Sequence, residues 1–282
     1  MSGLRLASRA FAWVVGLALA AWAIAVLALL IGRQELIYPF SERANAYNAA
    51  ALRGGEVHRF EASDGTELVA WITPPRRDRP VILFFMGNVG HLPANARRLN
   101  RLVDQGFGIA ALNFRGAGGA PGSPSEHAIT EDAVALYDSL DEMLGRTIPA
   151  GQRVAYGTSL GAAVAAQLAL RRQIGAVILA APFARLCEVG QHHYPWVPVC
   201  WVLPDNRWNT LDIVAELDAP LLVVHGGADQ VVPIAQAEAL VAAARAPTTF
   251  IRYPEGGHAD LHRFGSGPDT VDWLNATLGS AE

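Results

Sequence analysis

A serine between two glycines is the first group in this sequence whose type and spacing could do chemistry. Ser159 lies in Gly157-Thr158-Ser159-Leu160-Gly161, after a short apolar stretch and before an alanine-rich one. Between a strand and a helix, the G-x-S-x-G pattern predicts a sharp, strained turn that exposes the hydroxyl, and the flanking glycines remove β-carbons that would clash. We expect Ser159 to be a nucleophile. The alternative is an ordinary glycine-containing turn capped by serine.

A serine hydroxyl needs a general base within hydrogen-bond reach, and the sequence offers one after the last predicted strand. His258 lies in Pro254-Glu255-Gly256-Gly257-His258, a loop expected at the carboxyl end of the sheet. His225 ends a strand, and we expect its ring to pack beside the site. His262 is expected to be a solvated helix residue. The sequence therefore favours His258 as the base.

Asp229 is the predicted carboxylate that orients this base. It follows a predicted strand, in His225-Gly226-Gly227-Ala228-Asp229, and lies between the serine and the histidine along the chain. Asp218 precedes the same strand, at the wrong end of a parallel sheet. Asp260 is expected to be a loop or cap residue, because the order serine, acid, histidine disfavours it. Ser159, Asp229 and His258 thus form a predicted triad for acyl transfer.

Two backbone N–H groups are candidates for stabilising the oxyanion of a tetrahedral intermediate. One belongs to Leu160, the residue after the nucleophile. The other belongs to Asn88, in the loop Met86-Gly87-Asn88-Val89-Gly90, where a glycine lets the backbone approach a substrate. For this second loop, a plain strand-to-helix turn is the alternative.

The elements that must position these groups alternate between strand and helix. Val81–Phe85 is a continuous apolar run, typical of a strand buried on both faces, and the alternation after it predicts a mostly parallel sheet with helices on both faces. Such sheets bind ligands at the carboxyl ends of their strands. Residues 56–72 alternate and turn at Asp64-Gly65, which predicts a hairpin. The other strands are expected at Gly108–Phe114, Arg153–Tyr156, Ala176–Ala180, Pro220–His225 and Thr248–Tyr253, and the helices at about 93–105, 125–144, 160–172, 233–244 and 268–278.

The N-terminal part predicts a membrane anchor. Phe11 to Ile31 is an uncharged apolar run long enough, as a helix, to cross a hydrocarbon core of roughly 30 Å. A cleaved signal peptide and a buried soluble helix are the alternatives. We expect an anchor over residues 1–32, a connector over 33–55 and the main domain over 56–282. Arg5, Arg9 and the terminal amine precede the run, and Arg33 and Arg43 follow it, so the positive charge slightly favours an inside N-terminus and a translocated domain.

An aromatic insertion over about 183–211 is expected to form a short lid over the site. Its rings suit an acyl chain or a hydrophobic ester, or they only pack the lid onto the domain. Cys187 and Cys200 either pair with each other or remain free thiols. The adjacent His192 and His193 lack a third ligand, so we expect a solvated pair and no metal.

Composition gives no sign of a nucleic-acid partner. The net charge is −4, and the sequence has no basic run, so nothing points to nucleic acid. No internal repeat interrupts the main domain, whose length allows a large core.

Several further motifs carry a family resemblance. They are Leu36-Ile37-Tyr38-Pro39, Met86-Gly87-Asn88, Asn113-Phe114-Arg115-Gly116, Gly118, Gly122, Pro124-Ser125-Glu126 and the motifs of Ser159, Asp229 and His258. With the apolar N-terminus, they resemble the Bem46-like branch of the α/β-hydrolases, related to the serine aminopeptidase-like and ABHD13/ABHD17-like groups. Met86 stands where this branch usually has histidine. We expect a looser oxyanion loop there, but retained activity, because the donors are backbone groups.

The resemblance implies an α/β-hydrolase fold and hydrolysis of small acyl substrates without a metal or organic cofactor. We therefore expect a membrane-anchored serine hydrolase of carboxylic esters or thioesters. We expect it to be located in a bacterial inner membrane, with the catalytic domain on the periplasmic side. A peptidase or amidase using the same triad, and a catalytically silent binding protein on the same fold, are the alternatives.

Overall fold

The centre of the molecule is a single twisted sheet. The computed structural model describes residues 2–40, 45–88, 91–203 and 206–279. Within them, an eight-stranded sheet has the order β1-β2-β4-β3-β5-β6-β7-β8. β2 pairs antiparallel with β1 and β4, and all later neighbours are parallel. The strands are β1 (Glu56–Glu61), β2 (Glu67–Thr73), β3 (Val81–Phe85), β4 (Gly108–Asn113), β5 (Arg153–Thr158), β6 (Ala176–Ala180), β7 (Leu221–Gly226) and β8 (Thr248–Tyr253).

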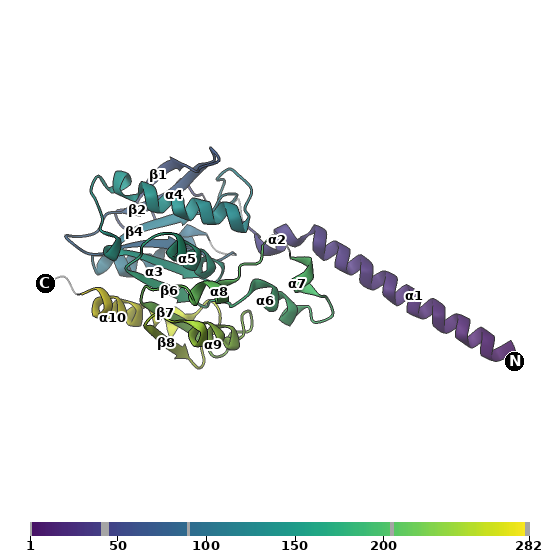
Figure 1. The fold of residues 1–282 in the computed structure, drawn as a ribbon. Coiled ribbons are helices and arrows are strands. Elements are labelled where there is room, and N and C mark those ends of the chain that lie inside the picture. The colour runs from purple at the N-terminus through teal and green to yellow at the C-terminus, as the bar shows by residue number, and fades with distance from the viewer. Residues whose placement is uncertain (1, 41–44, 89–90, 204–205, 280–282) are drawn as a thin grey trace.

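Helices cover the sheet in two groups, and one long helix stands apart from it (Figure 1). α4, α5, α8 and α9 pack each against the next, whereas α3 packs against α10. The helices are α1 (Ser2–Ile31), α2 (Arg33–Ile37), α3 (Leu92–Asp104), α4 (Glu126–Leu144), α5 (Leu160–Arg171), α6 (Leu186–His193), α7 (Val199–Val202), α8 (Thr210–Val214), α9 (Ile234–Ala243) and α10 (Ser266–Leu278), with short 3-10 turns at Ala150–Gln152 and Leu261–Arg263.

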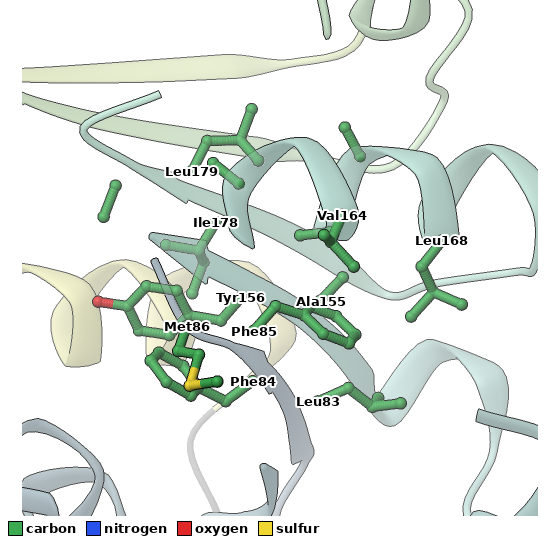
Figure 2. Packing of buried hydrophobic residues seen from close by; sticks show 14 of the residues in the cluster. Leu83, Phe84, Phe85, Met86, Ala155, Tyr156, Val164, Leu168, Ile178 and Leu179 are labelled. Carbon is green, nitrogen blue, oxygen red and sulfur yellow. The ribbon is translucent and has the colours of Figure 1, made fainter. Parts of the chain in front are cut away.

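The sequence pattern of each strand matches its place in the sheet. All residues of β3, β4 and β7 are buried, as their continuous apolar runs predict. The edge strands β1 and β8 are more exposed, with only Tyr253 of β8 buried. The predicted hairpin over residues 56–72 is confirmed as the antiparallel pair β1–β2. Met86 is fully buried in the same core cluster as Phe84 and Tyr156, so its side chain fills the interior (Figure 2).

A buried arginine closes the loop after β4. Arg115 donates from Nε to Asp132 Oδ2 at 2.7 Å and from Nη1 to Asp64 Oδ2 at 2.7 Å, and its Nη2 also pairs with Asp132. The Arg115 side chain is 5% exposed and that of Asp132 is fully buried. A buried charge is tolerated when it is paired and hydrogen-bonded, so this cluster joins β4, α4 and the β1–β2 turn.

The connector docks onto the main domain through buried polar groups. Tyr38 donates from its hydroxyl to Asn206 Oδ1 at 2.7 Å and accepts from Trp208 Nε1 at 3.0 Å. Asn206 Oδ1 also accepts from the backbone N–H of Glu126, at the start of α4. The Asn88 side-chain amide donates to the Ile37 carbonyl at 3.2 Å. The end of α2 is therefore tied to the lid, to α4 and to the loop after β3.

The lid contains two short helices joined by a disulfide. Cys187 of α6 and Cys200 of α7 are bonded, which decides between the two expectations for this pair. The aromatic rings divide into two sets. Phe183 and Trp208 are buried, whereas Tyr194, Trp196 and Trp201 are 37%, 51% and 86% exposed. Some rings thus pack the lid down, and others face outward.

The N-terminal helix projects from the domain (Figure 1). Ala7–Ile31 has a mean hydropathy of 2.8, and its most apolar window has no buried residues, so the length and composition suit either a membrane span or a signal sequence. Trp22 donates from its indole N–H to the carbonyl of Trp196 in the lid at 2.8 Å. The alternative of a buried soluble helix is therefore wrong, and the membrane anchor and the signal sequence both remain compatible with this helix.

Candidate active site

Ser159 occupies the strained turn that its motif predicts. It joins β5 to α5 with φ 52° and ψ −117°, a conformation that non-glycine residues rarely adopt. Both flanking glycines are needed because backbone segments approach them closely. A β-carbon at Gly157 would collide with the Gly161 carbonyl, and one at Gly161 would collide with the Phe85 carbonyl. The Ser159 N–H donates to the Ala180 carbonyl at 2.8 Å, which fixes the turn above β6.

The three predicted triad residues lie in one hydrogen-bonded chain. His258 Nε2 lies 3.0 Å from Ser159 Oγ, and His258 Nδ1 lies 2.7 Å from Asp229 Oδ2. An ionised carboxylate only accepts hydrogen bonds, so Nδ1 carries the imidazole hydrogen and Nε2 is free to accept from the serine hydroxyl. This is the arrangement required to activate a serine.

Asp229 is held ionised by its surroundings. Its side chain is fully buried, and its Oδ1 accepts from the backbone N–H groups of Val231 and Val232, each at 2.8 Å. Burial alone would raise the pKa of Asp229, but the hydrogen bonds from His225 and His258 outweigh burial and hold that pKa well below its usual range. The carboxylate therefore keeps its charge near neutral pH.

His225 takes a supporting place beside this carboxylate. Its ring is fully buried, with Nε2 2.9 Å from the Val232 carbonyl and 3.3 Å from Asp229 Oδ2. Because a carbonyl can only accept, Nε2 carries the hydrogen. The structure thus puts His225 beside the site, as expected. It also agrees with the expectation for Asp260, whose Oδ1 accepts from the Gly257 N–H within its own loop.

The loop after β3 runs against the nucleophile. A β-carbon at Gly87 would lie 3.4 Å from the Thr158 carbonyl and 3.5 Å from Ser159 Cβ. Asn88 lines the same cavity as Ser159, and Leu160 begins α5 directly after it. The backbone groups expected to bind an oxyanion therefore belong to two segments that meet at the serine. Val89 and Gly90 of the predicted loop lie outside the described residues.

A cavity of about 320 Å³ opens beside the serine, between the carboxyl ends of β5 and β6, α3 and the segment that leads into α10. Its size is within the range of small-molecule sites. The lining residues are Gly87, Asn88, Ala94, Asn95, Arg97, Arg98, Arg101, Leu102, Tyr156, Thr158, Ser159, Ala180, Ala181, His258, Ala259, Leu261, His262, Ser266, Gly267 and Thr270.

Two groups of this cavity differ from the sequence expectations. His262 is exposed, as predicted, but it also lines the cavity mouth. Arg97, Arg98 and Arg101 were not singled out from the sequence. Their spacing along one helix that follows the loop after β3 was the available signal, because residues three and four apart share a helix face.

The structure shows no metal-binding cluster in the part of the chain that it describes. Among the described residues, no group of three or more His, Cys, Asp or Glu side chains could hold an ion. His192 and His193 are exposed, and their ring centroids lie 5.2 Å apart. His193 Nε2 lies 2.9 Å from the Val231 carbonyl, so this ring contacts the loop beyond Asp229 and is not purely solvated.

Comparison with known proteins agrees with this fold. Residues 76–202 match the family model described as serine aminopeptidase, S33. An uncharacterized protein of Mycobacterium tuberculosis is 36% identical over 81% of both chains. The α/β hydrolase domain-containing protein WAV2 of Arabidopsis thaliana is 31% identical over 84% of this chain and 85% of its own.

Solved structures give the same fold. The esterase domain of a Rhodothermus marinus protein covers 80% of this chain and all of its own, with a TM-score of 0.61 and 23% identity. The chain therefore belongs to the α/β-hydrolase superfamily and is a hydrolase, and its residues 76–202 are similar to the serine aminopeptidase-like family. The predicted fold class and the family resemblance are confirmed.

Proposed function

We propose that this hydrolase is a membrane-anchored serine hydrolase that cleaves a carboxylic ester or thioester, including lipid-like acyl substrates. The observation that carries the proposal is the hydrogen-bonded chain from Ser159 through His258 to Asp229. A serine in an ordinary turn has no need of a strained backbone, a ring at its hydroxyl and a buried carboxylate behind that ring.

The reaction proceeds in two acyl transfers. His258 Nε2 takes the hydroxyl proton as Ser159 Oγ attacks the substrate carbonyl, and the same proton passes to the departing alcohol or thiol as its bond to the carbonyl breaks. The backbone N–H groups of Leu160 and Asn88 stabilise the oxyanion. Water then attacks the acyl-enzyme with His258 as base, which releases the acid and restores the serine. No step needs a metal or an organic cofactor.

The chain is organised as a membrane anchor over residues 1–32, a connector over 33–55 and a hydrolase domain over 56–282 with a lid at about 183–211. The long apolar helix supports the anchor, because none of its most apolar window is buried. The Cys187–Cys200 bond supports a periplasmic domain on a bacterial inner membrane, since disulfides persist in oxidising compartments.

A peptidase or amidase is the second candidate, favoured by the description of the matching family model. The same triad can attack an amide carbonyl. A panel of p-nitrophenyl esters of increasing chain length, run beside aminoacyl p-nitroanilides, separates the two. Ester turnover without anilide turnover supports the first candidate, and the reverse supports the second.

Labelling with a fluorophosphonate probe tests whether the serine is activated. We expect the full chain to be labelled and the Ser159→Ala variant to remain unlabelled, because the probe reacts with a serine whose proton is accepted by a neighbouring base. A matched control is Ser125→Ala, which removes the hydroxyl that caps α4. Folded wild-type protein that resists the probe would instead favour a catalytically silent binding protein.

A further inference from the structure

Among the described residues, the cavity beside Ser159 is lined with positive charge and no carboxylate. Arg97, Arg98 and Arg101 of α3 line it, and no Asp or Glu is among the lining residues. None of these arginines forms an ion pair with another described residue, in contrast to Arg115, which is paired with two carboxylates. The residues that the structure describes therefore leave the positive charge of these arginines unbalanced.

Arg98 has a donor that is buried without an acceptor. Its Nη1 is shielded from solvent and has no hydrogen-bond partner among the described residues. The guanidinium lies 5.9 Å from the ring centroid of Tyr156, which also lines the cavity. A charged donor without an acceptor costs free energy, and a rotation of this side chain toward the cavity that it lines brings the donor to a bound anion.

Arg101 adds a second positive group at the same wall. Its guanidinium lies against the backbone of Gly267, in the first turn of α10, where a β-carbon would collide with it. This helix has no side-chain cap, and its N-terminus carries partial positive charge. A guanidinium and a helix N-terminus both carry positive charge, so together they favour an anion.

The carboxylates near this helix are already engaged. Asp269 Oδ2, in the first turn of α10, accepts from the Tyr253 hydroxyl at 2.6 Å. Asp260 Oδ1 accepts from the Gly257 N–H at 2.7 Å. Neither residue lines the cavity. Neither carboxylate is therefore placed to balance the arginines inside the cavity, whereas a ligand anion bound there is.

We infer that the substrate of Ser159 carries an anionic group, a carboxylate or a phosphate, that binds Arg98 and Arg101 between α3 and α10. This inference rests on the proposed function, because it places the substrate's carbonyl at the serine and its anion on the arginine wall of the same cavity. The anion is bound and is not transformed. An anionic lipid headgroup and a small soluble anionic ester share this chemistry.

Matched ester pairs test the inference on the full chain in detergent. Mono-p-nitrophenyl glutarate is compared with p-nitrophenyl hexanoate, and 1-oleoylglycerol 3-phosphate with 1-oleoylglycerol. We expect kcat/KM to favour the anionic member of at least one pair. In the double variant Arg98→Gln/Arg101→Gln, the anionic-to-neutral ratio should fall about 10- to 100-fold, the scale of losing charge-assisted hydrogen bonds. The ratio cancels any general loss of activity.

The two pairs distinguish the source of the anion. A preference confined to the lipid pair assigns the wall to a headgroup, and one confined to the glutarate pair assigns it to a soluble ester. Arg172→Gln is the control, because Arg172 is paired with Asp138 at the surface and does not line the cavity. It should keep the wild-type ratio. A ratio near one in the wild type that the double variant does not change would overturn the inference and leave the proposed function standing.

Inorganic phosphate gives a readout that does not depend on turnover. At matched ionic strength, phosphate should raise the Tm of the wild type and of Arg172→Gln, but not of the double variant, because a ligand stabilises the fold that binds it. If Ser159 proved inert while this shift persisted, the anion site would stand and the proposed function would fall. No shift in the wild type, together with an unchanged ester ratio, would remove the anion site.

Discussion

Two groups of arginines in this molecule have opposite surroundings. Arg115 is nearly buried, and each of its donor groups meets a carboxylate of Asp132 or Asp64. Arg98 and Arg101 line the cavity beside the serine and meet no carboxylate among the described residues. The first group is complete within the chain and stabilises the fold. The second is completed only by something that binds. In these two groups, the paired charge stabilises the fold and the unpaired charge lines the cavity.

The same comparison applies to the two buried aspartates, and the same substitution can be made in both. Asp229→Asn should lower kcat by about 10⁴-fold, because an amide no longer holds His258 in the tautomer that accepts the serine proton. The free energy of unfolding should change far less than in Asp132→Asn. Steady-state kinetics measures the first effect, and denaturant unfolding measures the second. A variant that retained kcat within tenfold of the wild type would remove Asp229 from the triad.

Asp132→Asn should have the reverse effect. It leaves the buried Arg115 with one carboxylate, and we expect the free energy of unfolding to fall by about 3 kcal/mol, the low end for breaking a buried ion pair. The kcat of the protein that remains folded should be unchanged, because Asp132 does not line the cavity. Denaturant unfolding and kinetics on the same preparation measure both quantities.

The control for this variant is Asp138→Asn, which breaks the surface pair with Arg172. Exposed pairs contribute about 0–1 kcal/mol, so this variant should unfold near the wild-type midpoint. Equal losses in Asp132→Asn and Asp138→Asn would show that the Arg115 cluster is not a special contributor to stability.

The smallest expected effect is on the pH dependence of stability, and it concerns Asp64, the exposed carboxylate that pairs with Arg115. Hydrogen bonds from Arg115 and then from Thr66 hold the pKa of Asp64 well below its usual range. A group whose pKa is lowered in the folded state contributes stability above its unfolded pKa of about 3.9, and this contribution is lost as the pH falls. Asp64→Asn should therefore make the free energy of unfolding less sensitive to pH below about 4.

Denaturant midpoints at neutral and acidic pH measure this sensitivity. Asp78→Asn is the matched control, because Asp78 is exposed and makes no ion pair with another described residue. It should keep the wild-type dependence on pH. If the free energy of unfolding of Asp64→Asn fell as steeply in acid as that of the wild type, Asp64 would not be the source of the acid sensitivity. Other carboxylates, such as Asp229, would then account for it.

Much of the fold could be predicted from local patterns. Val81–Phe85 is buried on both faces, and only an uninterrupted apolar run satisfies that position. The three residues of the predicted triad could be found because each follows a strand, and the carboxyl ends of parallel strands meet at one edge. Their hydrogen bonds lie within the geometry that this reasoning requires.

The cavity wall could not be predicted in the same way. Whether Arg101 faces solvent or a cavity depends on how α3 packs against α10, whose residues lie more than 150 positions further along the chain. The cysteine pairing has the same origin, since α6 and α7 must fold back on each other before Cys187 can reach Cys200. Tertiary packing decides both, and no local pattern encodes it.

The hydrogen bond between Trp22 and Trp196 has a consequence for how substrate arrives. Trp22 lies nine residues before the end of the apolar helix at Ile31, which is roughly 14 Å along its axis. If that helix crosses a bilayer, the exposed lid rings of Tyr194, Trp196 and Trp201 contact the lipid tails. The enzyme would then meet its substrate by diffusion in the plane of the membrane. Turnover would follow the surface density of substrate in the leaflet and would be almost indifferent to the volume of water around it.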